Sequence, residues 1–253
     1  MARITVIGAG VAGMSAAYEL RSTLGRGHEI TVVGQGSRFS FTPSNPWIAV
    51  GWRTAEQTNI EAGPVLKKRG IDFRNSPVTR IDAAGNYIEL ADGERIDHDY
   101  LLICTGPKLD FAAIPGLGPE TGFSQSICTT PHAEHAWKEY QRFLEAPGPI
   151  VVGAAPGASC FGPAYEFAFI LDADLRKRKL RDRVPMTYVT SEPFIGHMGL
   201  GGVGDSKGLL ESELRQRHIN WITNARVKEV RTDAVVVQEC DQAGQSVGEK
   251  VLP

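Results

Sequence analysis

The sequence predicts an α/β fold with two Rossmann-like modules, because a buried strand, a glycine-rich turn and a helix follow one another twice along its 253 residues. The first unit begins at residues 4–7, a mostly β-branched, apolar stretch that is typical of a strand buried on both faces. The second begins at residues 150–153 and leads to a helix expected over residues 165–177. Between them, Pro147-Gly148-Pro149 breaks the chain, so we expect modules over residues 1–146 and 147–253.

The other elements of the first module follow from short apolar runs bounded by turn residues. Strands are expected over residues 29–33, 72–74, 78–82, 87–90 and 100–104. Proline, glycine and aromatic residues over 39–52 predict a loop. Pro64 suits the first turn of a short helix ending near residue 69, and a longer helix is expected over residues 132–144.

In the second module, further strands are expected over residues 184–190 and within residues 225–239. Residues 247–253 resemble a strand that has just begun, with no helix after it. We therefore expect the chain to be the amino-terminal portion of a longer protein, truncated before its remaining cofactor-binding and membrane-binding segments.

Composition and charge narrow the possible functions. The 27 basic and 29 acidic residues leave a net charge of −2, so no basic surface for nucleic acid is expected. The four cysteines are widely spaced and form no Cys-x-x-Cys pair, so we expect neither a disulfide scaffold nor a metal site. No export signal and no transmembrane helix is predicted, since the chain opens directly on a strand pattern and its longest uncharged stretch, residues 146–165, is broken by prolines and glycines.

The first turn carries a dinucleotide-binding pattern, in which glycines let the backbone approach a pyrophosphate at the amino end of a helix. The pattern comprises Gly8, Ala9, Gly10, Val11, Ala12 and Gly13. The acidic residue that usually holds the ribose is replaced by Gly34-Gln35, so Gln35 or backbone groups would take that role. The turn alone does not distinguish FAD from NAD, and a tight turn without ligand is the alternative.

A second pattern favours FAD. Residues 99–106, in which the strand over 100–104 leads to Thr105-Gly106, resemble the second signature of two-dinucleotide flavoprotein reductases, where such a turn lies close to the flavin nucleotide. Val78 falls where these proteins often contact the adenine. Neither feature is specific alone, but the two support each other and predict FAD.

The second glycine turn is degraded, because Ala155 and Ala158 stand where glycines would be expected and Pro156 stiffens the backbone. We expect this module to have lost its NAD(P)H site and to present the thiol of Cys160 instead. The alternative is a fold element without a function of its own.

Three segments and one loop are more specific than the glycine patterns. The segments are Gln125-Ser126-Ile127-Cys128-Thr129, residues 157–166 around Cys160, and residues 190–197 ending in His197; the loop is residues 42–47. Over the whole chain these features resemble the sulfide:quinone oxidoreductase family, in its bacterial type. The resemblance implies a membrane-associated FAD enzyme that oxidises sulfide to polysulfide or sulfur and passes two electrons to a quinone.

The resemblance implies roles for individual residues. Cys160 and Cys128 match redox cysteines of the family, which exchange sulfur through a disulfide or persulfide and deliver electrons to the flavin. An isolated cysteine is more often a small buried hydrophobe, as we expect of Cys104 and Cys240. Thr42 would lie at the cofactor.

His132 and His197 match family positions near the sulfide site, where a histidine can exchange protons near neutral pH. Hydrogen-bonded structural histidines are the alternative. Glu166 follows Cys160 by six residues and either relays protons or satisfies local donors.

The implied partners are sulfide, a quinone and the surface of a bacterial cell membrane, contacted through a region after residue 253, with a homo-oligomer as a further expectation. The third redox cysteine and the quinone pocket would also lie after residue 253, so the activity of the chain by itself is an open question. Three alternatives remain: the flavoprotein subunit of flavocytochrome c sulfide dehydrogenase, an NADH:quinone reductase, and a non-catalytic FAD-binding fragment.

Overall fold

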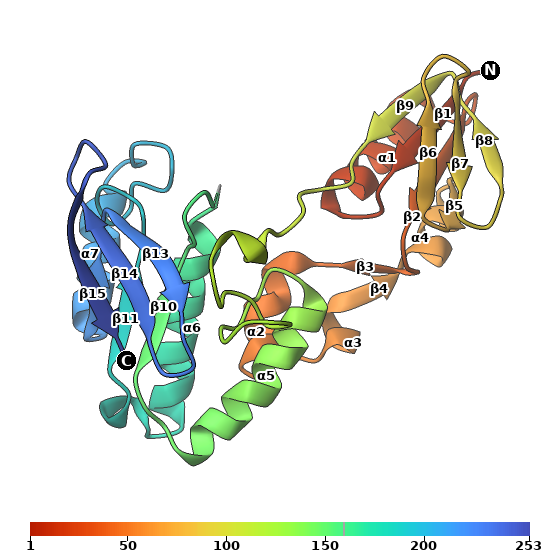
Figure 1. Cartoon of the computed structure of the whole chain (residues 1–253). Coiled ribbons are helices and arrows are strands. Elements are labelled where there is room, and N and C mark those ends of the chain that lie inside the picture. Colours follow the sequence, from red (N-terminus) through yellow and green to blue (C-terminus); the bar gives the residue numbers. More distant parts are fainter. Residues whose placement is uncertain (159) are drawn as a thin grey trace. The chain divides into compact units, whose positions relative to one another are not determined.

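The computed structural model describes residues 1–158 and 160–253, which form two compact units (Figure 1). Unit 1 comprises Met1–Phe41 and Ala55–Leu109, and unit 2 comprises Thr42–Thr54 and Asp110–Pro253. The boundary between the two units therefore falls between residues 109 and 110, and residues 42–54, although they lie within the first half of the sequence, belong to unit 2. The modules expected from the sequence, which divide at residue 146, remain a prediction about nucleotide binding.

A four-stranded parallel sheet forms the centre of unit 1, in the order β5-β2-β1-β9. Its strands are β1 (Arg3–Ile7), β2 (Glu29–Gly34), β5 (Asp72–Asn75) and β9 (Tyr100–Ile103). The helices of the unit are α1 (Val11–Leu24), α3 (Ala55–Thr58) and α4 (Ala62–Lys68). Because neighbouring strands run parallel, the loops at their carboxyl ends meet at one edge of the sheet.

Successive side chains along a strand point to opposite faces of the sheet, and the two faces of this sheet pack against different elements. On one face, Val6 and Val32 pack with Met14 of α1 and Leu66 of α4. On the other, β1 and β2 pack against an antiparallel sheet whose Ile88 is fully buried. That sheet consists of β6 (Val78–Asp82), β7 (Tyr87–Leu90) and β8 (Arg95–Asp97), and a separate hairpin pairs β3 (Arg38–Ser40) with β4 (Asn59–Glu61).

Unit 2 has a parallel sheet in the order β10-β11-β12 and an antiparallel sheet in the order β13-β14-β15. The strands are β10 (Ile150–Gly153), β11 (Met186–Val189), β12 (Ile219–Ile222), β13 (Ala225–Val230), β14 (Val235–Cys240) and β15 (Ser246–Leu252). The helices are η1 (Thr42–Ser44), α2 (Asn45–Ala49), η2 (Phe111–Ala113), α5 (Thr130–Glu145), α6 (Gly162–Lys177), η3 (Arg181–Arg183) and α7 (Ser206–Gln216).

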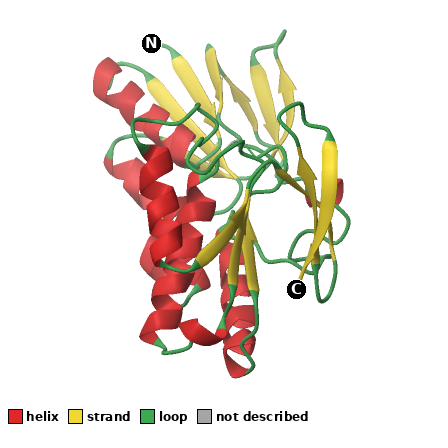
Figure 2. Ribbon diagram, turned by 90° about the vertical axis from the view of Figure 1, so that its left-hand side faces the viewer, coloured by secondary structure: helices red, strands yellow, loops and turns green. Residues whose placement is uncertain are grey.

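The parallel sheet of unit 2 lies between two layers (Figure 2). Val152 and Tyr188 face α6 and α7, in a core that includes Leu214. Val151 and Val189 face the antiparallel sheet, where Val237 is fully buried. The α/β class with parallel sheets is thus confirmed.

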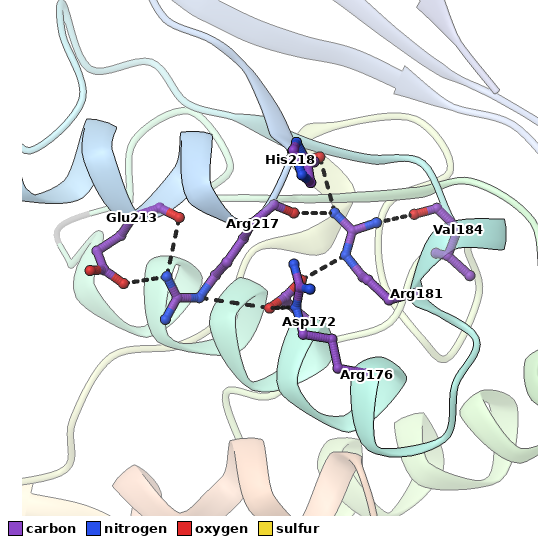
Figure 3. Close-up of polar contacts among 7 residues, drawn as sticks. All are labelled: Asp172, Arg176, Arg181, Val184, Glu213, Arg217 and His218. Carbon is purple, nitrogen blue, oxygen red and sulfur yellow. Dashed lines mark hydrogen bonds and ion pairs between the residues drawn. The ribbon is translucent and has the colours of Figure 1, made fainter.

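A buried charge cluster joins α6, η3 and the turn before β12 (Figure 3). The Asp172 carboxylate, whose side chain is only 3% exposed, accepts from Arg181 Nε at 2.7 Å and from Arg176 Nε at 2.9 Å, and Arg217 Nε lies 3.7 Å away. The other donors of Arg181 reach the carbonyl oxygens of Val184, Arg217 and His218. Each of the three nitrogens of this buried guanidinium therefore has an acceptor.

Several sequence-based expectations need correction. Residues 39–52 are not simply a loop, because they contain the end of β3, η1 and α2, and Pro46 sits in the first turn of α2, where its fixed φ is favourable. The strand expected over residues 247–253 is confirmed as β15, but it has not just begun: it is a complete strand of seven residues, paired with β14 in the antiparallel sheet. Helix α7 and strand β12 were not expected. In the described part of the chain, no helix combines the length and apolar character needed to cross a membrane.

Candidate active site

The glycine turn between β1 and α1 is fixed by close packing at two of its three glycines. Gly8 has φ +111°, and a Cβ there would lie 2.1 Å from the carbonyl oxygen of Cys104. A Cβ on Gly13 would lie 1.8 Å from the carbonyl oxygen of Gly8. Both positions require glycine for the turn to fit between β9 and α1, whether or not a ligand binds.

Gly10 is different, because a Cβ there would meet no atom within 4 Å. Its backbone is extended, it begins α1 without a side-chain cap, and it is exposed together with Val11 and Ala12. Packing within the protein gives no reason for glycine at this position. The open space in front of the first N–H groups of α1 fits a dinucleotide pyrophosphate, which needs a close backbone approach and the positive end of a helix.

Other residues expected at the cofactor gather around this turn in unit 1. Gly34 ends β2 and is buried, and a Cβ on it would come within 2.7 Å of the Ala9 side chain, so β2 abuts the turn. Gln35 follows and is exposed, at the end of the strand where a ribose-binding acid usually stands. Thr105 and Gly106, also exposed, follow β9 at the same edge of the sheet.

Two further cofactor candidates are not part of these turns. Val78 begins β6 and is half-buried, in unit 1. Thr42 begins η1 and is exposed, in unit 2. The roles of Val78 and Thr42 stay predictions.

Cys128 lies at the amino end of α5, and its side chain is a free thiol on an exposed residue. Thr129 caps the helix, with its hydroxyl oxygen accepting from the His132 N–H at 3.3 Å. The His132 Nε2 lies 3.3 Å from a carboxylate oxygen of Glu120, and its buried Nδ1 has no hydrogen-bond partner among the described residues. One ring nitrogen of His132 therefore faces a carboxylate, while the other is buried.

A buried amide fixes the segment that carries Cys128. Asn45, 1% exposed at the start of α2, donates from Nδ2 to the carbonyl oxygen of Ile127 at 3.0 Å and accepts from the Thr130 hydroxyl at 3.3 Å. Sequence reasoning missed this contact, although Asn45 lies in the loop over residues 42–47 that carried the resemblance. Its polar side chain in an otherwise apolar short helix was the available signal.

Cys160 is also a free thiol on an exposed residue, and it lies just before α6. Glu166 is exposed on the first turns of that helix. In the turn before them, a Cβ on Gly153 would lie 2.1 Å from the Val189 carbonyl oxygen, so this glycine is kept for packing. Ser159, part of the segment that carried the resemblance, lies outside the described residues.

His197 lies in the turn after β11, half-buried, with its ring edge-on to Phe194 at a centroid distance of 5.2 Å. Its neighbours contact the beginning of α6: a Cβ on Gly162 would lie 3.6 Å from the Met198 methyl, and one on Gly199 would lie 3.5 Å from the Phe161 ring. The segment carrying His197 therefore packs beside the residues that directly follow Cys160.

The two cysteine segments share a packing partner. Ile48 and Ala49 of α2 form a small core with Ala133 of α5, against which Ile127 and Phe167 also pack. Residues flanking Cys128 and residues on the helix after Cys160 thus contact the same short helix. Unit 2 brings together the segments of Cys128, His132, Cys160, Glu166 and His197.

Sequence reasoning also missed Glu192, which lies inside one of the segments that carried the resemblance. This residue is 2% exposed, and its carboxylate accepts from the hydroxyls of Tyr165 and Thr190, both at 2.8 Å. Burial, reinforced by the bond to Glu192, raises the pKa of Tyr165 and keeps its hydroxyl protonated, although an N–H donated by Gly196 partly opposes the shift.

Comparison with known proteins identifies the family of the chain. Residues 2–249 match the model of pyridine nucleotide-disulphide oxidoreductases. The chain belongs to this family. Proteins of this family are FAD-binding flavoproteins, so the cofactor expected from the sequence, FAD, is confirmed.

Among curated relatives, the chain is 44% identical over 236 residues to the sulfide-quinone reductase of Aquifex aeolicus, an alignment that covers 93% of this chain and 54% of that protein. The crystal structure of the sulfide:quinone oxidoreductase from that bacterium matches with a TM-score of 0.91 at 42% identity, covering 100% of this chain and 57% of the other. Within its family, the chain thus resembles sulfide:quinone oxidoreductases, as expected from the sequence. It spans about half the length of these two relatives.

The structure of NDH2 from Plasmodium falciparum in complex with NADH matches with a TM-score of 0.76 at 16% identity, covering 99% of this chain and 53% of the other. At that identity the likeness shows the fold alone.

Proposed function

We propose that the protein containing this chain is an FAD-dependent sulfide:quinone oxidoreductase, which oxidises sulfide to polysulfide or elemental sulfur and passes the electrons to a membrane quinone. The observation that carries this proposal is the pair of exposed, free thiols, Cys128 and Cys160, on segments that pack against one short helix. The likeness to the Aquifex aeolicus enzyme and the open space at Gly10 support it.

The open turn at Gly10 would hold the pyrophosphate, and Gln35, Thr105 and Gly106 stand at the same edge of the sheet. When bound, FAD supplies the acceptor for an electron pair, which the quinone finally takes up. Cys128 and Cys160 would take part as the sulfur-exchanging side chains, with Val78 and Thr42 as further cofactor contacts.

The sulfur chemistry is thiol–disulfide exchange. Hydrosulfide attacks one sulfur of an oxidised cysteine, present as a disulfide or persulfide, and a new S–S bond forms. The old S–S bond breaks, and its other sulfur leaves as a thiolate that holds the electron pair. The proton of hydrosulfide passes to a base, for which His132, His197 and Glu166 are the candidates in this chain.

A quinone substrate resides in a membrane, so we place the enzyme on the surface of the bacterial cell membrane, in contact with it through a part of the protein outside this chain. A homo-oligomer remains a prediction.

The test uses the full-length protein with FAD bound, mixed anaerobically with sulfide and then with a short-chain quinone. We expect sulfide to bleach the flavin absorbance, the quinone to restore it, and NADH to have no effect. The Cys160→Ala variant should keep its flavin and lose the response to sulfide, whereas Cys240→Ala, on β14, should behave as wild type. Rapid bleaching by NADH, or an active Cys160→Ala variant, would contradict the proposal.

A further inference from the structure

Glu192 is a buried carboxylate, and both of its oxygens accept hydrogen bonds from the chain's own donors. Its Oε2 accepts from the hydroxyls of Tyr165 and Thr190, and its Oε1 accepts from the backbone N–H of Met198 at 2.6 Å. Among the described residues, no cationic side chain forms an ion pair with it. A buried carboxylate with three hydrogen bonds and no counter-ion orders the groups that bond to it.

The position of Glu192 in the fold is informative. It follows β11, the second strand of a strand–turn–helix unit, where an acidic residue normally faces a bound ribose. Here the residue is 2% exposed and turned into the protein. The carboxylate is therefore committed to contacts within unit 2.

Those contacts lead to the His197 loop, which we define as residues 194–199. Met198 has φ +57°, a left-handed conformation that is strained for a residue with a side chain. Such strain persists only where surrounding contacts hold it, and the bond from Met198 N–H to Glu192 is one of them. Tyr165 provides the second, because its hydroxyl donates to Glu192 and accepts from the N–H of Gly196 at 3.0 Å.

Both anchored amides flank His197, and the anchored residues pack beside the start of α6. Met198 approaches Gly162, two residues after Cys160, and Tyr165 lies on the same helix. The buried carboxylate thus ties the loop of the histidine to the helix that follows the cysteine.

We propose that Glu192 is a positioning residue, which holds the His197 loop in place against the segment after Cys160 through Met198 and, by way of Tyr165, through Gly196. The proposal rests on the proposed function only in assigning His197 to sulfide oxidation; the anchoring itself does not depend on it.

The experiment uses the full-length protein with FAD bound and the variant Glu192→Gln, which keeps the side-chain shape but deprives the two buried hydroxyls of their charged acceptor. Glu134→Gln, at an exposed position on α5, is the matched control. Two measurements are made: hydrogen exchange of the Gly196 and Met198 amides, and the single-turnover rate of flavin reduction by sulfide. Each is repeated with Tyr165→Phe, which removes the hydroxyl yet keeps the ring stacked on Tyr188 at 4.4 Å.

In Glu192→Gln we expect exchange at the two amides to quicken by about tenfold or more, and flavin reduction to slow by a similar factor, the effect of losing one charge-assisted hydrogen bond. Flavin content and melting temperature should change little. In a His197→Gln background, the added substitution of Glu192 should no longer slow the reaction, because the two residues act as one unit.

Unchanged amide exchange in both Glu192→Gln and Tyr165→Phe would overturn the anchoring. A full, additive loss of rate in the His197→Gln background would show that Glu192 does not act through the loop. If the wild-type flavin is not reduced by sulfide at all, the proposed function fails, and the exchange measurement still decides the anchoring.

Discussion

Substituting Gly10 and Gly13 separately distinguishes a glycine kept for a ligand from one kept for packing. Gly10→Ala places a methyl group where no atom lies within 4 Å, in a backbone conformation, φ −83° and ψ −170°, that alanine adopts without strain. The change at this helix start costs about 0.5–1 kcal/mol. Reduced freedom of the unfolded chain returns about 0.4–1 kcal/mol. The stability of the flavin-free protein should therefore hardly change.

The same methyl group would stand between the backbone and the pyrophosphate. Overpacking of a fitted site costs about 1–3 kcal/mol. That corresponds to a rise in the Kd for FAD of roughly 5- to 150-fold. Gly13→Ala should do the opposite: its Cβ would lie 1.8 Å from the Gly8 carbonyl oxygen, so α1 must shift and the flavin-free protein itself loses stability.

The assay removes FAD from each full-length variant, measures unfolding of the flavin-free protein by urea, and titrates FAD back by flavin fluorescence. If Gly10→Ala binds FAD as tightly as wild type, the open space is not the pyrophosphate site. If it destabilises the flavin-free protein as much as Gly13→Ala, the distinction between the two glycines is wrong.

The local parts of the fold could be predicted because their signals lie close together in the sequence. The turn from Gly8 to Gly13 is set by steric conflicts within a few residues and with the end of β9. Strands β1, β2 and β11 of the two parallel sheets are mostly buried, which gives nearly continuous apolar runs in the sequence. Cys128 and Cys160 are exposed, but Cys104 and Cys240, expected to be buried, are only partly buried, and a redox role for the first two came from the resemblance alone.

Elements without such a signal were missed. Helix α7 has a single fully buried residue, Leu214, so its sequence shows little apolar periodicity, and its start depends on the Asp205 side chain that caps it. Helix α2 has five residues, too few for a periodic pattern, and it is held by Asn45 through a contact across 82 positions of sequence. The direction in which Glu192 points depends on donors from its own loop and on the Tyr165 hydroxyl of α6, 27 positions away, and no sequence pattern encodes that.

Three further predictions concern the buried polar groups of unit 2. The folded protein raises the pKa of Tyr165 above its usual 10.0, so the stability that its neutral hydroxyl contributes is complete below the usual pKa and is lost progressively as the pH rises from there through the folded pKa. Tyr165→Phe should therefore remove a late step from the tyrosinate absorbance titration. Asn45→Ala should cost about 1–3 kcal/mol in urea unfolding and speed alkylation of the neighbouring Cys128, because a carbonyl and a hydroxyl lose their buried partner. Asp172→Asn should cost about 3–5 kcal/mol, because Arg181, with a side chain only 9% exposed, keeps its charge and its three carbonyl acceptors but loses its counter-ion. The exposed pair broken by Glu211→Gln is the control and should cost about 0.3–0.5 kcal/mol. Equal losses of unfolding free energy in Asp172→Asn and Glu211→Gln would show that burial does not govern how much the Asp172 cluster contributes to stability. Removing one partner of a buried ion pair leaves a charge that water cannot solvate, whereas removing one partner of an exposed pair does not.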